Sequence, residues 1–411
     1  MTKGTISETA VYAIKNPSSI REIMSLVTDF KKHPEKYPRP LIYLGGGWPQ
    51  DPPPPALKEV AKEVIEDDNT WIESSRYGTT RGQPDFISGI VNYEKYVFNR
   101  KILEEEVIVG SGSTELTAAF MLSILDPGTE VIITRPGYLN YPRQVQIETL
   151  LRCKIKRWTI LRNHEFNPDF DELQEMISDK TRMLIICTPG NPDGQIYADD
   201  MLNAINDIAE EEGIWVMVDV AYRTFIYEKP PRYFSRERRE NEIWMCTLSK
   251  EFRIPGWRMA YAVADKELID AVETVEQARI LCPNRMAQEI LTRVLQDNKK
   301  LKSVKEYYEK GRDKYKKVAQ YTTEELRNNI PGLGILEPRG GFYVFFDASS
   351  YEKSSKKLCN DLLKECQVAL APGVDFGMEG WLRLSFAPIV EEPETLKEGL
   401  NRMKEYFSKR K

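Results

Sequence analysis

The stretch TLSKEFRIPGWRMAYAV, residues 247–263, sets a lysine and an arginine between two apolar runs. The runs, IWMCTL from Ile243 and MAYAVA from Met259, are typical of buried strands. Lys250 and Arg258 therefore fall on a short connection between two core strands, where removing a charge from water is costly. A purely structural explanation does not need these charges there, so we expect them to have a chemical role.

The same pattern of apolar runs extends outward through most of the chain. Between residues 105 and 265 the runs alternate with helical segments, and they are EEVIVG (105–110), EVIIT (130–134), MLIICT (183–188) and IWVMVD (214–219). Near-continuous apolar strands separated by helices predict a mostly parallel sheet that is covered on both faces. Later runs predict the strands of a smaller unit, and they are GFYVFF (341–346), VALAP (368–372) and WLRLSFA (381–387).

We therefore predict an α/β fold with a large domain, in which helices sandwich a mostly parallel mixed sheet, and a smaller α/β C-terminal domain. The expected division is an N-terminal segment over 1–55 that packs with the small domain, a large domain over 56–300 and a small domain over 301–411. Ligands of such sheets bind at the carboxyl ends of the strands, so the loops at those ends are expected to carry the chemistry.

Composition and charge exclude several classes of protein. Lys and Arg number 58 against 63 Asp and Glu, a net charge of -5, which argues against a nucleic-acid or anionic-membrane partner. No apolar run is long enough to span a bilayer. Six cysteines without a CxxC motif predict reduced thiols in a cytoplasmic protein. With only His33 and His164, we expect neither a histidine triad nor a metal site built from histidines.

The stretch VGSGSTE (109–115) has the composition of a phosphate-binding turn. Gly110 and Gly112 allow a tight turn with exposed N–H groups, and Ser113 and Thr114 add hydroxyls at the start of a helix. Two other interpretations are open. One is a plain helix cap, since both hydroxyl residues are good caps. The other is a dinucleotide site, which is weak because Glu115 occupies the third glycine position and no acid ends the next strand.

Two further strand ends carry polar residues. In CTPGNPDGQIY (187–197), Asn191 either belongs to an ordinary turn or directs its amide into the cleft. IWVMVDVAY (214–222) ends a strand on Asp219, with Tyr222 three residues later. A P-loop NTPase is disfavoured because no GxxxxGK[ST] occurs in the chain. A buried carboxylate needs a partner, and a protonated heterocycle would serve.

Lys250 and Arg258 of the opening stretch add an amine and a guanidinium to the polar groups at the other strand ends. Arg258 offers a planar fork suited to phosphate, and a desolvated Lys250 amine is the usual nucleophile for a Schiff base with an aldehyde. Taken alone, the pair is better explained as two solvated loop charges. Taken with the phosphate turn, Asn191, Asp219 and Tyr222, the pair matches the requirements of pyridoxal phosphate.

Over nearly its whole length the sequence resembles the fold-type I, class I/II pyridoxal-phosphate-dependent aminotransferases, in particular the aspartate and aromatic branch. SKEFRIPGWR (249–258) is similar to the family's lysine motif. The resemblance implies that Lys250 forms the Schiff base, with Ser249 as a cofactor contact and Arg258 on the phosphate. GSGSTE is similar to the phosphate turn, which implies the cofactor contacts Gly112, Ser113 and Thr114.

Two motifs imply contacts to the cofactor ring. NPDG resembles N-P-T-G and places Asn191 on the pyridine 3-oxygen. DVAY resembles D-E-A-Y and gives Asp219 to the pyridinium nitrogen and Tyr222 to the 3-oxygen. The sequence departs from the family pattern at Asp193, at Val220 and at the start of the turn (188–190), but no departure removes a catalytic group.

Four segments extend the resemblance to the ring face, the partner subunit and the substrate. Tyr138 in RPGYLNY falls where the family stacks an aromatic ring on the cofactor, and Tyr77 in RYGTTRG where a tyrosine reaches the neighbouring subunit's phosphate. The second match implies a homodimer. Gly47 in LGGGWP and Arg383 in WLRLSFA fall where the family holds the substrate carboxylate, and Asn191 is expected to contact the substrate as well.

The implied reaction is a ping-pong transfer of an amino group from an L-amino acid to a 2-oxo acid, with catalytic roles for Lys250, Asp219 and Tyr222. A carbon–sulfur β-lyase or another lyase would use the same residues. A non-catalytic ligand-binding relative is disfavoured by the presence of Lys250. The amino acid is left open: Arg285 or Arg279 either reads a second carboxylate or lies on a helix surface, and Trp48 either lines an aromatic pocket or packs the N-terminal segment.

Overall fold

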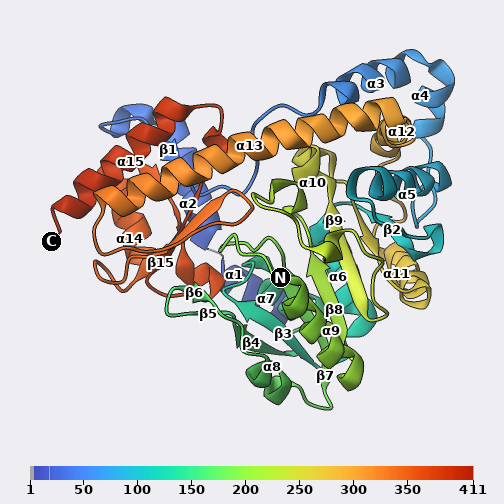
Figure 1. Ribbon diagram of the computed structural model, residues 1–411, viewed down its shortest axis with the longest axis horizontal. Coiled ribbons are helices and arrows are strands. Elements are labelled where there is room, and N and C mark those ends of the chain that lie inside the picture. The colour runs from blue at the N-terminus through green and yellow to red at the C-terminus, as the bar shows by residue number, and fades with distance from the viewer. Residues whose placement is uncertain (1–3, 18, 411) are drawn as a thin grey trace.

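The computed structural model describes residues 4–17 and 19–410, and its central element is a seven-stranded sheet with the order β2-β10-β9-β8-β7-β3-β4 (Figure 1). The strands are β2 (Val107–Gly110), β3 (Glu130–Arg135), β4 (Lys154–Thr159), β7 (Thr181–Cys187), β8 (Trp215–Asp219), β9 (Glu242–Thr247) and β10 (Ala260–Val263). Pairing is parallel from β4 through β9, whereas β10 runs antiparallel to both β9 and β2. The prediction of a mostly parallel mixed sheet is confirmed.

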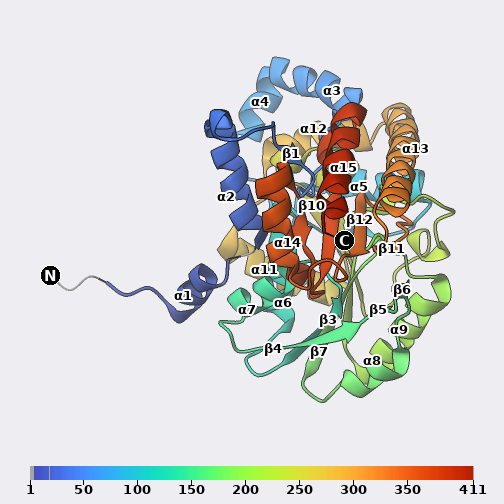
Figure 2. The ribbon, with the colours of Figure 1, turned by 90° about the vertical axis from the view of Figure 1, so that its left-hand side faces the viewer.

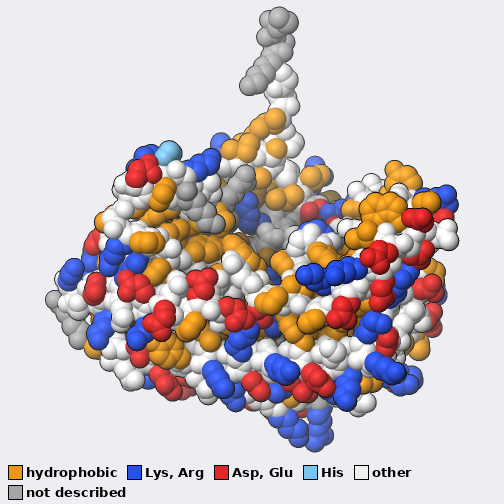
Figure 3. Space-filling view, turned by 90° about the horizontal axis from the view of Figure 1, so that it is seen from above, with side chains coloured by type: hydrophobic (Ala, Val, Ile, Leu, Met, Phe, Trp, Pro, Cys, Tyr) orange, Lys and Arg blue, Asp and Glu red, His pale blue; other side chains and the backbone are white. Residues whose placement is uncertain are grey.

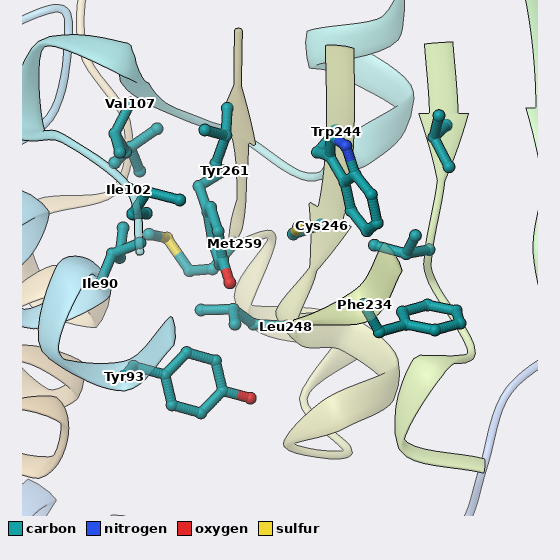
Figure 4. Close-up of a cluster of buried hydrophobic side chains, with 14 of the residues drawn as sticks. Ile90, Tyr93, Ile102, Val107, Phe234, Trp244, Cys246, Leu248, Met259 and Tyr261 are labelled. Atoms are coloured by element: carbon teal, nitrogen blue, oxygen red, sulfur yellow. The ribbon is translucent and has the colours of Figure 1, made fainter. Parts of the chain in front are cut away.

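Helices cover both faces of this sheet because its strands are apolar on both sides. In β7, Leu184 and Ile186 belong to one core cluster and Met183 and Ile185 to another. The first cluster contains side chains of α5 (Pro84–Phe98), α9 (Asp199–Glu212) and α12 (Arg285–Leu295). The second contains side chains of α6 (Ser113–Ile124), α7 (Asn140–Glu148) and α11 (Lys266–Arg279). Figure 4 shows part of the first cluster, with Trp244, Cys246 and Tyr261 of the sheet beside Ile90 and Tyr93 of α5.

A second sheet forms the smaller C-terminal unit. Its order is β11-β12-β15-β14, and all its pairs are antiparallel. The strands are β11 (Gly334–Leu336), β12 (Tyr343–Asp347), β14 (Ala371–Pro372) and β15 (Trp381–Ser385). The accompanying helices are α14 (Ser355–Asp361), which continues into a π-helical turn over Leu362–Cys366, and α15 (Pro393–Ser408).

Two segments make connections to the small unit: a short strand connects it with the N-terminal segment, and a long helix connects it with the large unit. β1 (Ile42–Tyr43) pairs in parallel with β13 (Val368–Ala369), so backbone hydrogen bonds tie the N-terminal segment to the C-terminal unit. The long helix α13 (Asn298–Asn329) starts beside α12 and runs along α15 (Figure 1). The domain bounds of 1–55, 56–300 and 301–411 remain a prediction.

The remaining N-terminal elements are helical. They are α1 (Glu8–Lys15), α2 (Ser19–Lys32), α3 (Pro55–Glu66) and α4 (Asp68–Ser74). Figure 2 shows α1 extending away from the body of the protein toward the N-terminus. Cationic and anionic side chains are interspersed over the face in Figure 3, in keeping with the balanced composition. Within 4–17 and 19–410, no helix combines the length and apolar character that crossing a membrane requires.

Candidate active site

The carboxyl ends of the central strands open on one cavity, which brings together most of the residues singled out in the sequence. Its walls come from the segments that follow β2, β3, β7, β8 and β9, as expected for a parallel sheet. The lining residues are Ser113, Thr114, Tyr138, Cys187, Asn191, Asp219, Ala221, Tyr222, Thr247, Ser249, Lys250, Pro255 and Arg258. Lys250 and Arg258, the two cations between the core strands, are therefore neighbours of Asp219 and Asn191 in space.

One end of the cavity is built to hold an anion. Helix α6 begins directly after Gly112, which has a φ of 95°, and no side chain caps the helix. A Cβ atom on Gly112 would collide with the guanidinium of Arg258, so glycine leaves the room that the arginine occupies. The capping interpretation of Ser113 and Thr114 is wrong, because both are helical residues whose side chains line the cavity. Uncapped N–H groups, hydroxyls and a guanidinium favour a bound phosphate.

A buried carboxylate lies elsewhere in the same cavity wall. Asp219 is 8% exposed; its Oδ2 accepts a hydrogen bond from the Tyr141 hydroxyl (2.5 Å) and its Oδ1 one from the Ala221 N–H (3.0 Å). Burial raises the pKa of Asp219, and these two hydrogen bonds oppose the rise. No ion pair to Asp219 occurs among the described residues. A cation that enters the cavity next to Asp219 would be stabilised by its charge.

Lys250 lies on α10 (Leu248–Glu251), the short helix after β9. Its Nζ atom donates a hydrogen bond to the carbonyl oxygen of Gly47 at 2.8 Å. Burial lowers the pKa of Lys250 to about 8, with further lowering by the charges of Arg258 and Arg383 and an opposing effect of Asp219. A substantial fraction of the amine is therefore neutral near pH 8, which is the form that acts as a nucleophile or base.

A second cavity of about 530 Å3 adjoins the first and shares Tyr138, Asn191, Tyr222, Lys250 and Pro255 with it. Its other lining residues are Gly45, Gly46, Gly47, Trp48, Leu139, Tyr343 and Arg383. The structure thus places Gly47, Trp48 and Arg383 together, although they are far apart in the sequence.

Asn191 connects the two cavities through its amide. Its Nδ2 donates to the Tyr222 hydroxyl (3.0 Å), and its Oδ1 accepts from Nη1 of Arg383 (2.8 Å). Arg383 is 2% exposed; its Nη2 donates to the Gly45 carbonyl (2.8 Å), and its buried Nε has no hydrogen-bond partner among the described residues. Such a guanidinium is prepared to hold a carboxylate.

Three predicted residues lie outside both cavities of the single chain. Tyr77 is 81% exposed, so its expected reach into a neighbouring subunit is not tested by one chain. Arg279 forms ion pairs with glutamates at 115, 148 and 276, and Arg285 with those at 73 and 289. Neither arginine lines these two cavities, and one chain does not test whether either reaches a neighbouring site.

Sequence reasoning missed two tyrosines that hold the predicted groups. Tyr141 donates to Asp219, and the Tyr343 hydroxyl lies 3.0 Å from that of Tyr222. A polar hydroxyl inside the apolar run GFYVFF could have indicated Tyr343, since a buried tyrosine hydroxyl needs a partner. Tyr141 gives no such signal, because its position on α7 is decided by tertiary packing.

Residues 39–402 match the sequence family described as aminotransferase class I and II. The chain belongs to this family. Enzymes of the family depend on pyridoxal phosphate, and this protein is a pyridoxal-phosphate-dependent aminotransferase that acts on amino acids and 2-oxo acids. The prediction from the sequence motifs is confirmed.

Known relatives cover most of this aminotransferase. An aspartate aminotransferase of Pyrococcus horikoshii is 32% identical over 88% of the chain and 90% of its own length. An aromatic-amino-acid aminotransferase of Thermococcus litoralis is 26% identical over 96% of the chain and 97% of its own length. A solved aspartate aminotransferase of Thermus thermophilus superposes with a TM-score of 0.87 at 26% identity, covering 98% of this chain and 100% of that one. All three are aminotransferases, and the lyase alternative receives no support from them.

Asp193, the residue that departs from the family turn, is expected to make the aminotransferase less stable at neutral than at acidic pH. It is buried, its Oδ1 accepts from the Gln195 N–H at 2.9 Å, and burial raises its pKa from 3.8 to about 7. The folded protein therefore binds this proton more tightly than the unfolded chain, and stability falls as pH rises from about 4 to 7. Asp193→Asn keeps the acceptor and removes the charge. We expect it to raise the free energy of unfolding at pH 8 by a few kcal/mol, since a tenfold difference in proton affinity corresponds to about 1.4 kcal/mol.

Urea unfolding of wild type and Asp193→Asn at pH 5 and pH 8 measures this effect. At pH 5 the difference between the two proteins should be much smaller, because the folded wild type keeps the carboxyl protonated at little cost. An equal difference at both pH values would contradict the assignment.

Proposed function

We propose that the aminotransferase transfers the amino group of an L-amino acid to a 2-oxo acid, and that Lys250 carries the cofactor and moves the proton at the substrate Cα. One observation carries this proposal: Lys250 is half-buried and lines both cavities, and desolvation lowers the pKa of its amine to about 8. A neutral amine in this position can act as nucleophile toward an aldehyde and as a general base.

Borohydride reduction tests the attachment residue directly. The purified protein is incubated with pyridoxal phosphate, reduced and digested, and the modified peptide is identified by mass spectrometry. We expect the label on Lys250. A label confined to any other lysine would refute the assignment.

The chemistry of the cavity fits pyridoxal phosphate. The anion-binding end offers Gly112, Ser113, Thr114, Ser249 and Arg258 to the phosphate. The buried Asp219 carboxylate, which lacks a cation partner among the described residues, suits a protonated ring nitrogen. When bound, the cofactor supplies an electron sink for the electrons released as a bond to the substrate Cα breaks.

The groups that would surround the ring come from three loops. Asn191 and Tyr222 present an amide and a hydroxyl 3.0 Å apart, a pair suited to a phenolic ring oxygen. The Tyr343 hydroxyl, 3.0 Å from that of Tyr222, holds Tyr222 in place. Tyr138 lines both cavities, where its ring can cover a face of the cofactor. With the cofactor bound, the Asp219 carboxylate would favour a protonated ring nitrogen, and the Lys250 amine would take the proton from the substrate Cα.

Arg383 and Gly47 would hold the substrate carboxylate in the second cavity. The guanidinium is buried above the Tyr343 ring at 4.4 Å, and its Nε has no partner among the described residues. Replacing Arg383 with lysine removes the planar fork. Because a hydrogen bond to a charged group contributes about 1.5–3 kcal/mol, we expect Arg383→Lys to raise the KM for the amino acid about 10- to 100-fold.

Steady-state kinetics with both substrates varied measures this loss. The matched control is Arg327→Lys, an exposed arginine paired with Glu337 outside the cavities. A KM for Arg383→Lys equal to that of the control would show that the carboxylate binds elsewhere.

The second cavity also supports a substrate class. Trp48, Leu139 and Tyr343 give it an apolar wall, and the cations among its lining residues are Lys250 and Arg383, which already have roles. We infer that the amino donor carries an aromatic or large apolar side chain rather than a second carboxylate. A higher kcat/KM for aspartate than for phenylalanine or tyrosine would overturn this inference.

We also propose a cytoplasmic homodimer in which Tyr77 reaches the phosphate of the neighbouring site. Tyr77 is exposed, and apolar side chains with exposed surface lie in the same part of the sequence or beside the 282–285 loop: Ile65, Trp71, Ile72 and Leu281. The six cysteines are all unpaired, which supports a reducing compartment.

Analytical ultracentrifugation of wild type and Tyr77→Phe, together with cofactor titrations, tests the homodimer and the role of Tyr77. A monomeric wild type would contradict the proposal.

A further inference from the structure

Arg253 lies three residues after Lys250 in an unusual backbone conformation. Its φ is 55°, in the left-handed region that side-chain-bearing residues seldom adopt, and its side chain is fully buried. A strained residue next to a functional lysine persists only when its surroundings hold it there. The contacts of the Arg253 guanidinium therefore indicate which parts of the protein hold this residue in its strained conformation.

The guanidinium joins the lysine turn to the N-terminal segment. Nη1 of Arg253 donates to the carbonyl oxygens of Lys250 (3.0 Å) and Glu251 (2.9 Å). Nε donates to the carboxylate of Asp51 at 3.3 Å, in an ion pair whose members are 0% and 3% exposed. Asp51 follows Gly47 by four residues. One buried side chain thus connects the backbone of Lys250 with the loop that borders the substrate cavity.

The long helix α13 is shaped to accept this guanidinium. Asp51 accepts a further hydrogen bond from the Tyr315 hydroxyl on α13 at 2.7 Å. One turn earlier on the same helix, a Cβ atom on Gly311 would lie 2.7 Å from Nη2 of Arg253. Glycine is unfavourable inside a helix, so its presence at 311 is explained by the room it leaves for Arg253. The guanidinium also lies over the Phe225 ring at 4.4 Å, three residues after Tyr222.

The same two segments are connected a second time inside the cavity, where Nζ of Lys250 donates to the Gly47 carbonyl at 2.8 Å. We propose that Arg253 and Asp51 are positioning residues, which fix the lysine turn against the Gly47 loop and α13 so that Lys250 Nζ stays aimed into the substrate cavity. The proposal rests on the function proposed for Lys250. In this arrangement the buried ion pair between Arg253 and Asp51 keeps Lys250 and the Gly47 loop at a constant separation.

The test uses Asp51→Asn, Arg253→Lys and Gly311→Ala. The first two weaken the ion pair, and the third adds a methyl group against the guanidinium without changing any charge. The control is Glu242→Gln, which removes a carboxylate from another ion pair, Glu242 to Arg236 at 2.5 Å, whose members are 0% and 26% exposed. Neither member of this pair lines the cavities, and Glu242 begins β9 at the end of the strand opposite to the lysine turn, so the control costs stability without touching Lys250.

Two readouts are compared. In the cofactor-free protein, the pH dependence of Lys250 acetylation by acetic anhydride, followed by mass spectrometry, reports the pKa of the amine. We expect the three variants to shift this pKa from about 8 toward the ordinary value of 10.5, because a displaced amine gains solvent, and the control to leave it unchanged. With cofactor, we expect kcat to fall about 10- to 100-fold with little change in KM.

Unchanged pKa and kcat in all three variants would overturn the proposal. If Arg253→Lys does not fold, Asp51→Asn and Gly311→Ala decide it in the same way. Equal changes in Glu242→Gln would also overturn it, because the effect would then be a general loss of stability. Turnover by Lys250→Ala would instead refute the proposed function itself, so the two failures are distinguishable.

Discussion

Replacing Lys250 with alanine is expected to lower the rate of amino transfer by about 10^4-fold, near the upper range for loss of a positioned acid–base group. The variant lacks both the amine that binds the cofactor aldehyde and the base that moves the Cα proton. The phosphate and ring contacts stay in place, so the variant should still bind pyridoxal phosphate non-covalently. Steady-state rates and cofactor titrations measure the two effects separately.

The control for this variant is Lys299→Ala, an exposed lysine at the start of α13. It should retain wild-type rates. A Lys250→Ala protein that binds cofactor and keeps its turnover would show that the proton is moved by another group.

Replacing Asp219 with asparagine should lower kcat/KM by about 200- to 5000-fold. Asparagine has nearly the same shape as aspartate and keeps one acceptor oxygen for the Ala221 N–H, while its Nδ2 group can donate to the Tyr141 hydroxyl oxygen in place of the hydrogen bond that Asp219 accepts. Breaking a buried pair of charges costs about 3–5 kcal/mol, which corresponds to this range. The loss should appear in kcat, because the charge acts on the ring nitrogen during the chemical step.

The matched comparison is Asp193→Asn, which neutralises a second buried carboxylate that lines neither cavity. We expect its kcat/KM to stay within a few-fold of wild type. Equal losses in the two variants would show that the effect does not depend on a charge placed at Asp219, and would contradict its assigned role.

The fold could be predicted because its strands are apolar on both faces. β7, β8 and β9 are continuous apolar runs that end on polar residues, so their positions and the location of the site follow from the sequence. The pairing of β1 with β13 could not be predicted, since two-residue strands carry no periodic signal and their pairing depends on the packed C-terminal unit.

The site was predictable where a residue ends a strand or lies within three residues of its end, as Asp219 and Lys250 do. Residues whose contacts depend on tertiary packing were not predictable. Tyr141 reaches Asp219 only because α7 packs on the sheet, and Arg253 has the appearance of an ordinary loop cation until Asp51 is placed beside it. The sequence left a plain helix cap at Ser113 and Thr114 open, because the need to admit Arg258 at Gly112 is a tertiary constraint. The role of Tyr77 stays a prediction.

The most direct test of amino transfer through Lys250 follows the amino nitrogen. Purified protein with pyridoxal phosphate receives an isotopically labelled aromatic amino acid and an unlabelled 2-oxo acid, and the products are analysed by mass spectrometry. We predict that the label appears in the amino acid formed from the 2-oxo acid, that no ammonia accumulates, and that Lys250→Ala abolishes the transfer. Release of the label as ammonia, or transfer that persists in Lys250→Ala, would contradict this mechanism.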